Sequence, residues 1–115
     1  MAEVRLRRLE SLLREEISSM IFTSKIKDPR IERLTTVTDV SISKDLANAK
    51  VFVSFYGEEA ELHASVGALN HASGYIQRVL AERIRIRKMP RLSFIADTSI
   101  ARGARINKLL RDIAT

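Results

Sequence analysis

The sequence predicts an α+β fold in which one three-stranded sheet packs against helices, within a single domain spanning residues 1–115. Three segments carry apolar residues at helical spacing, and three shorter segments are β-branched or alternate between apolar and polar positions. Breaks at Pro29, Gly57 and Pro90 separate several of these segments. The chain has 115 residues, of which 45% are hydrophobic, so one buried core is expected.

The first expected element is a helix over residues 3–22. Its apolar residues recur on one helical face, and they are Leu6, Leu9, Leu13, Ile17 and Met20. Glu10 and Arg14 add a favourable pair one turn apart. The dipeptide Asp28-Pro29 ends this region, because proline disfavours helical angles in the residue before it.

Two strands follow the first helix. Residues 34–42 are β-branched and largely alternating, and residues 50–56 alternate again, with Val51, Val53 and Phe55 on one face. The intervening segment, 43–49, supplies polar turn residues. The two strands therefore should form an antiparallel pair, each with one face toward the core.

The helical pattern resumes from about Glu58 to Arg85, with Gly74 in its middle. Spacing alone allows two interpretations of Gly74: a glycine tolerated within one helix, or a break between two helices. The helix should give way to an extended segment near Arg85 and before Pro90, although residues 82–88 also fit a strand.

The third expected strand is residues 91–96, with Leu92 and Phe94 facing inward. A last helix should follow. Its cap would be Asp97, Thr98 or Ser99. Its apolar stripe would consist of Ile106, Leu109, Leu110 and Ile113. The predicted order is helix, strand, strand, helix, helix, strand, helix.

Positive charge is concentrated in one part of the chain. Twenty Lys and Arg exceed fourteen Asp and Glu, for a formal net charge of +6. Three acids and no Lys or Arg lie between Gly57 and Gln77. The next segment, residues 78–91, contains six bases and only one acid, Glu82. These six bases are Arg78, Arg83, Arg85, Arg87, Lys88 and Arg91.

Such segregation favours a basic face that binds nucleic acid over a merely solvated surface. We expect three further cations to extend this face: Arg5, Arg8 and Lys108. Phosphate contacts should dominate the binding, with base stacking as a minor contribution, because the phenylalanines at 52, 55 and 94 are expected within strands.

Several other classes of protein do not fit the sequence. The chain has no cysteine, no apolar run long enough for a membrane span, and no apolar stretch of the signal-peptide kind at its start. His63 and His71 lack carboxylates at ligand spacing, and the scattered glycines make no phosphate-binding loop. We therefore expect a soluble cytoplasmic protein that is not an enzyme and uses neither a metal nor a cofactor.

Several longer motifs resemble those of the bacterial ribosome-binding factor A family. These motifs are "KDPRI", "VTDVSISKDLANAKVFVS", "ASGYIQRVLAERIRIRKMPRLSF" and "DTSIARGARINKLL". The resemblance implies a type II KH-like fold whose usual Gly-x-x-Gly is replaced by Ala-x-Gly. Here that motif is Ala72-Ser73-Gly74, which would form a kink with Gly74 as its hinge. On this basis Gly74→Ala is expected to destabilise the fold.

The resemblance also implies a function. Proteins of this family are assembly factors that bind the free 30S ribosomal subunit, contact 16S rRNA near the neck, support processing of its 5′ end and matter for growth in the cold. An assembly GTPase is a further expected partner, and the chain is expected to be a monomer. The alternative from the charge pattern is a basic protein–protein module that docks on a ribosomal protein or a GTPase.

Overall fold

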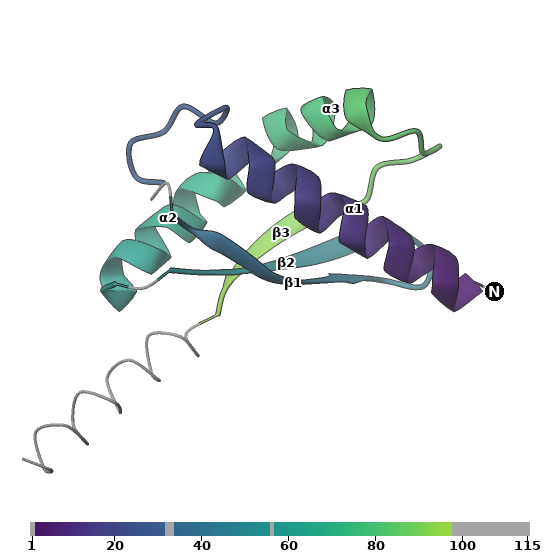
Figure 1. Cartoon of the computed structure of the whole chain (residues 1–115), viewed down its shortest axis with the longest axis horizontal. Coiled ribbons are helices and arrows are strands. Elements are labelled where there is room, and N and C mark those ends of the chain that lie inside the picture. The colour runs from purple at the N-terminus through teal and green to yellow at the C-terminus, as the bar shows by residue number, and fades with distance from the viewer. Residues whose placement is uncertain (1, 32–33, 56, 98–115) are drawn as a thin grey trace, which may run out of the picture.

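The computed structural model describes residues 2–31, 34–55 and 57–97 (Figure 1). Its elements in chain order are α1 (Ala2–Phe22), β1 (Thr36–Ile42), β2 (Asn48–Ser54), α2 (Glu59–His71), α3 (Ser73–Arg83) and β3 (Arg91–Ala96). The α+β class and the order of these six elements are confirmed. The last helix predicted from the sequence lies outside the described residues, as does the proposed site residue Lys108.

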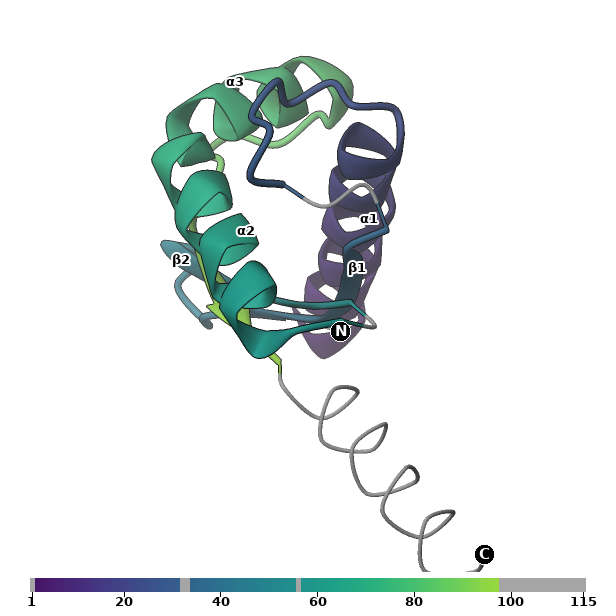
Figure 2. The ribbon, with the colours of Figure 1, turned by 90° about the vertical axis from the view of Figure 1, so that its left-hand side faces the viewer.

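The described residues form two layers, with the three helices on one face of the sheet (Figures 1 and 2). The strand order is β1-β2-β3. Strands β1 and β2 are antiparallel, as predicted, with Val40 opposite Val51. Strand β3 runs parallel to β2 because the chain reaches it through the crossover of α2 and α3, which places Val51 beside Phe94.

The core lies between the sheet and the helices. Alternate strand residues face it, as the period of two predicts, and α1 contributes the apolar stripe predicted from its helical spacing. The side chains with least exposure include Leu13, Ile17, Met20, Val51, Val53, Leu62, Leu69, Ile76 and Leu80. Burial of these side chains provides the main stabilising contribution to the fold.

Side-chain amides from the helices cover the outer edge of β3. Asn70 Oδ1 accepts a hydrogen bond from the Phe94 N–H (2.8 Å), and Asn70 Nδ2 donates to the Phe94 carbonyl (2.9 Å). Gln77 Oε1 accepts from the Leu92 N–H (3.2 Å). An open strand edge invites pairing with another chain, so these amides satisfy the edge groups at Leu92 and Phe94 and tie α2 and α3 to the sheet.

The helical segment breaks where the resemblance places a kink, but Gly74 is not the hinge. The break is at Ala72, whose φ of −89° and ψ of 4° lie in a region open to any residue. Gly74 is exposed in the first turn of α3, and no described glycine has a positive φ. A Cβ built on Gly74 meets no atom within 4 Å. The structure therefore gives no reason for glycine at this position, in contrast to the expectation from the resemblance.

The end of α3 also differs slightly from the prediction. The helix ends at Arg83, and Ile84 is already extended, with φ −116° and ψ 126°. Ile84 is buried, and its extended backbone takes the chain off the helix axis. Arg85, which was expected at the helix end, therefore belongs to the connecting segment.

Candidate nucleic-acid interface

The segment between α3 and β3 exposes three of the predicted basic residues, and a fourth, Arg91, begins β3. Ile84 and Pro90 are buried and fix its two ends. Between them Ile86 and Met89 are partly buried, and the other side chains are exposed. The exposed cations of this region are Arg85, Arg87, Lys88 and Arg91. Their charges face solvent, as expected for groups that cannot be buried without partners.

This segment lies beside the turn between β1 and β2. The Arg91 N–H donates a hydrogen bond to the Ala47 carbonyl (2.9 Å). The pKa of Asp45 is lowered, chiefly by a hydrogen bond from the Ser43 hydroxyl and to a smaller extent by the positive charge of Lys88. The same turn exposes Lys44, which sequence analysis did not select because it stands apart from the basic run.

The start of α1 belongs to the same end of the molecule. Glu10 Oε2 accepts a hydrogen bond from the Ile42 N–H (2.9 Å), which fixes this part of α1 against the end of β1. Arg5 and Arg8 are exposed in the preceding turns. Figure 1 shows the start of α1, the β1–β2 turn and the segment after α3 at one end of the long axis.

We call this surface the basic end. It comprises the exposed residues Arg5, Arg8, Lys44, Arg85, Arg87, Lys88 and Arg91. They come from three segments that are far apart in the sequence. Their combined field favours a polyanion at this end of the protein.

The two remaining predicted cations lie on α3 itself. Arg83 Nη1 donates to Glu16 Oε2 of α1 at 3.0 Å, and both side chains are 34% exposed. Part of the Arg83 charge is therefore balanced within the protein. Arg78 is exposed near the middle of α3 and lines a shallow groove with Lys25 and Tyr75.

Acidic residues gather at the opposite end of the molecule. Glu58, Glu59 and Glu61 lie at the beginning of α2, where negative charge interacts favourably with the helix dipole. In Figure 1 the start of α2 lies at the other end of the long axis from the basic end. The resulting charge polarity would orient the protein as it approaches a polyanion.

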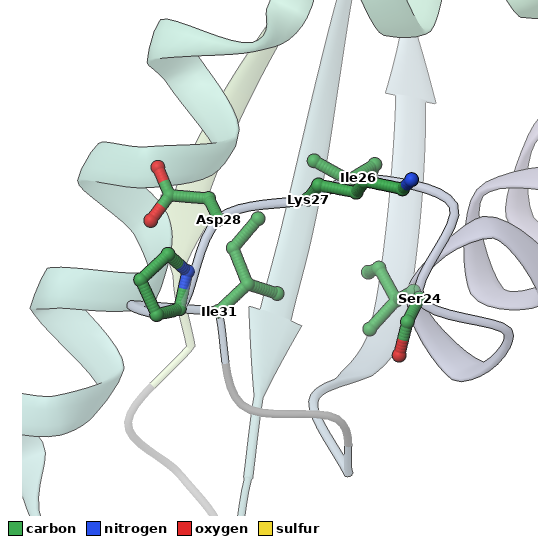
Figure 3. A pocket seen from close by; sticks show the side chains of 7 residues that line it. Ser24, Ile26, Lys27, Asp28 and Ile31 are labelled. Carbon is green, nitrogen blue, oxygen red and sulfur yellow. The ribbon is translucent and has the colours of Figure 1, made fainter.

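The loop after α1 contributes residues that sequence analysis missed. Figure 3 shows this loop from close by, with Ser24, Ile26, Lys27, Asp28 and Ile31 around a shallow hollow. Its residues Lys25 and Lys27 line a second hollow together with His71, Ala72 and Tyr75 from the helix break. Nothing in the spacing of the sequence indicates this proximity, because it results from packing.

Two further properties of the described residues bear on function. In residues 2–31, 34–55 and 57–97, no group of three or more His, Asp or Glu side chains is arranged to hold a metal ion. Within the same ranges, none of the helices has the length and apolar character that crossing a bilayer requires.

Comparison with known proteins identifies the family. The model of the family described as ribosome-binding factor A matches residues 5–110. The chain belongs to this family. A relative from Borreliella burgdorferi, named ribosome-binding factor A, is 44% identical over 108 residues, which cover 94% of this chain and 90% of the relative. The resemblance drawn from the sequence motifs is thus confirmed.

Solved structures of the family share the fold. The crystal structure of ribosome-binding factor A from Thermus thermophilus aligns with a TM-score of 0.69 at 33% identity, covering 79% of this chain and 93% of that one. A homology model of the Thermus thermophilus factor, fitted into a cryo-electron microscopy map of its complex with the 30S subunit, aligns with a TM-score of 0.63 at 34% identity. That alignment also covers 79% of this chain and 93% of the other.

Proposed function

We propose that this chain binds the free 30S ribosomal subunit during assembly, contacts 16S rRNA through its basic end and supports maturation of the 5′ end of that RNA. The observation that carries the proposal is the gathering of cations from three segments at one end of a ribosome-binding factor A fold. The fitting of the Thermus thermophilus relative into a 30S complex supports the same partner.

The proposed mechanism is binding by charge and shape, without a covalent step. Lys and Arg side chains would neutralise phosphates and release counterions. The Phe94 N–H and carbonyl are engaged by Asn70, so these groups are not free to read bases. Stabilising one conformation of the RNA in this way would present its 5′ end to the processing enzymes of the cytoplasm.

A salt titration of binding to purified 30S subunits tests the proposal. Replacing Arg85, Arg87 and Lys88 together by alanine should weaken binding and reduce the slope of log K against log salt by about one unit per lost contact. The control is Glu58→Gln with Glu61→Gln, which removes two charges of the opposite sign at the other end of the molecule and should leave the slope nearly unchanged. An unchanged slope in the triple variant, or an equal change in the control, would contradict the assigned surface.

The processing part of the proposal has its own measurement. Cells that carry the triple variant in place of the native protein should accumulate 16S rRNA with an unprocessed 5′ end, and should do so most strongly in the cold. Normal processing in cells whose variant no longer binds 30S subunits would separate the two roles and refute the second.

One surface favours a protein partner as a second candidate function. Phe22 is 60% exposed and Leu34 is 75% exposed, and both line one hollow with Ser18, Ser19 and Thr35. Exposed apolar side chains that lie together are typical of protein contacts. A ribosomal protein or an assembly GTPase would fit this surface. Phe22→Ser with Leu34→Ser should then weaken binding to intact subunits or to the GTPase, while binding to naked 16S rRNA is retained.

A further inference from the structure

The loop after α1 and the beginning of α3 enclose a continuous groove. One hollow is lined by Lys25, Ile26, Lys27, Asp28, His71, Ala72 and Tyr75. A second is lined by Lys25, Tyr75, Arg78, Val79, Glu82 and Arg83. Because Lys25 and Tyr75 belong to both, the two hollows adjoin. We call them together the loop groove.

The wall formed by the loop is held in place at both ends. Two residues beyond the end of α1, Ser24 lies in the left-handed region (φ 56°), and the Lys25 N–H donates to the Met20 carbonyl (2.9 Å). At the other end, the Ser65 hydroxyl of α2 donates to the Arg30 carbonyl (2.8 Å). Figure 2 shows the loop passing from α1 across to α2 and α3.

Positive charge predominates in the loop groove. Lys25, Lys27 and Arg78 are exposed and form no ion pair with any described residue. The carboxylate of Asp28 is engaged by Arg30 at 2.8 Å. Glu82 is the other acid of the groove and is exposed. The groove therefore has three cations that form no ion pair with a described residue and only one acid, Glu82, besides the paired Asp28. This excess of positive charge favours an anionic ligand.

An aromatic ring lies among these cations. Tyr75 is 39% exposed on the first turn of α3, in the stretch that both hollows share. Among the other described aromatic residues, Phe52, Phe55 and Phe94 are buried or partly buried, whereas Phe22 is exposed but does not line this groove. An exposed ring within a basic groove is the combination that binds single-stranded nucleic acid, since a base stacks on the ring while cations contact its phosphates.

We propose that the loop groove binds an unpaired segment of RNA, with one base stacked on Tyr75 and the adjoining phosphates contacted by Lys25, Lys27 and Arg78. This inference rests on the proposed RNA-binding function and adds a single-strand site that is separate from the basic end. A regular duplex does not fit, because its bases are stacked on one another and cannot offer a face to the ring. The groove lies on the flank of α3 toward the loop, whereas Gln77 faces the edge of β3.

Tyrosine fluorescence tests the stacking directly. The chain has two tyrosines and no tryptophan, so Tyr56→Phe leaves Tyr75 as the sole tyrosine. A short oligoadenylate should quench its emission, and an RNA duplex of the same length should not. In the full chain, Tyr75→Leu should weaken oligoadenylate binding by about five-fold or more, whereas Tyr75→Phe, which keeps the ring, should bind normally.

The charge contribution is measured in parallel. Lys25→Ala with Lys27→Ala should reduce the salt slope of oligoadenylate binding by about 1.4 units, since each phosphate contact with a single strand contributes about 0.7. The matched control is Lys50→Ala, an exposed lysine between the inward-facing Ala49 and Val51 of β2, and therefore on the sheet face away from the helices. Thermal melts of each variant check that the fold is retained.

The outcomes separate this site from the basic end. The loop groove would be overturned if oligoadenylate left the Tyr75 emission of Tyr56→Phe unchanged and bound Tyr75→Leu with normal affinity. The proposed function would still stand if the basic-end triple variant lost 30S binding. Weaker 30S binding by Tyr75→Leu with normal oligoadenylate binding would assign the groove to a protein partner and overturn the RNA site. If the groove variants lost binding to 30S subunits and the basic-end triple variant kept it, the result would support the groove and refute the basic end.

Discussion

Replacing Gly74 by alanine should stabilise the protein. The position is exposed, has ordinary backbone angles and offers open space to a Cβ, which meets no atom within 4 Å. Alanine at such a site restricts the unfolded chain without strain, which is worth about 0.4–1 kcal/mol. For a domain of this size the melting temperature should rise by about 2–8 °C. Urea melts at constant slope, together with thermal melts, measure the effect.

Two other glycines provide the controls. Gly67 lies inside α2 with no atom within 4 Å of an added Cβ, so Gly67→Ala should stabilise by a similar amount. A Cβ on Gly57 would collide with the ring of Phe55, so Gly57→Ala should destabilise. A lower midpoint for Gly74→Ala, with a higher one for Gly67→Ala, would refute the reasoning and restore Gly74 as a residue that the helix break requires.

Two further predictions concern a neutral hydrogen-bonded pair and an ion pair. Asn70→Asp should destabilise the fold by about 1–3 kcal/mol at neutral pH, because a carboxylate still accepts from the Phe94 N–H but cannot donate to the Phe94 carbonyl. Denaturant melts should show the loss shrinking in acid as the carboxyl regains a proton, and a pH-independent loss would contradict this. Hydrogen bonds from the Arg30 side chain and backbone lower the pKa of Asp28 from 3.8 to about 2, so its stabilising contribution is complete above pH 3.8 and disappears as the pH falls through about 2. An NMR titration should show the pKa of Asp28 rising toward 3.8 in Arg30→Ala, and an unchanged value would assign the shift to another cause.

The polarity of the molecule connects its fold to its proposed role. The cations of the basic end and the acids at the start of α2 lie at opposite ends of the long axis (Figure 1). The loop groove lies along α3, with Arg78 near the middle of that helix. An RNA held at both sites would therefore contact the protein along α3 as well as at its end.

Local periodicity made the elements and their buried faces predictable. The stripe on α1 and the alternation around Val51 and Val53 were correct because helices repeat every 3.6 residues and strands every two, whatever they pack against. Breaks near Pro29 and Pro90 were also correct, because proline acts on its own backbone and on its neighbour. The family could also be predicted from the sequence, because its motifs are continuous segments of the chain.

Only tertiary packing decided which side chains share a surface. Contact between α1 and α3 pairs Arg83 with Glu16, and the loop after α1 brings Lys25 beside Tyr75. The helix break lies at Ala72, whose angles any residue can adopt, so the glycine of the family motif did not mark the residue at the break. Periodicity predicts which face of a helix or strand is buried. The partner of an exposed charge lies on a segment distant in sequence, and only tertiary packing determines where the two segments meet.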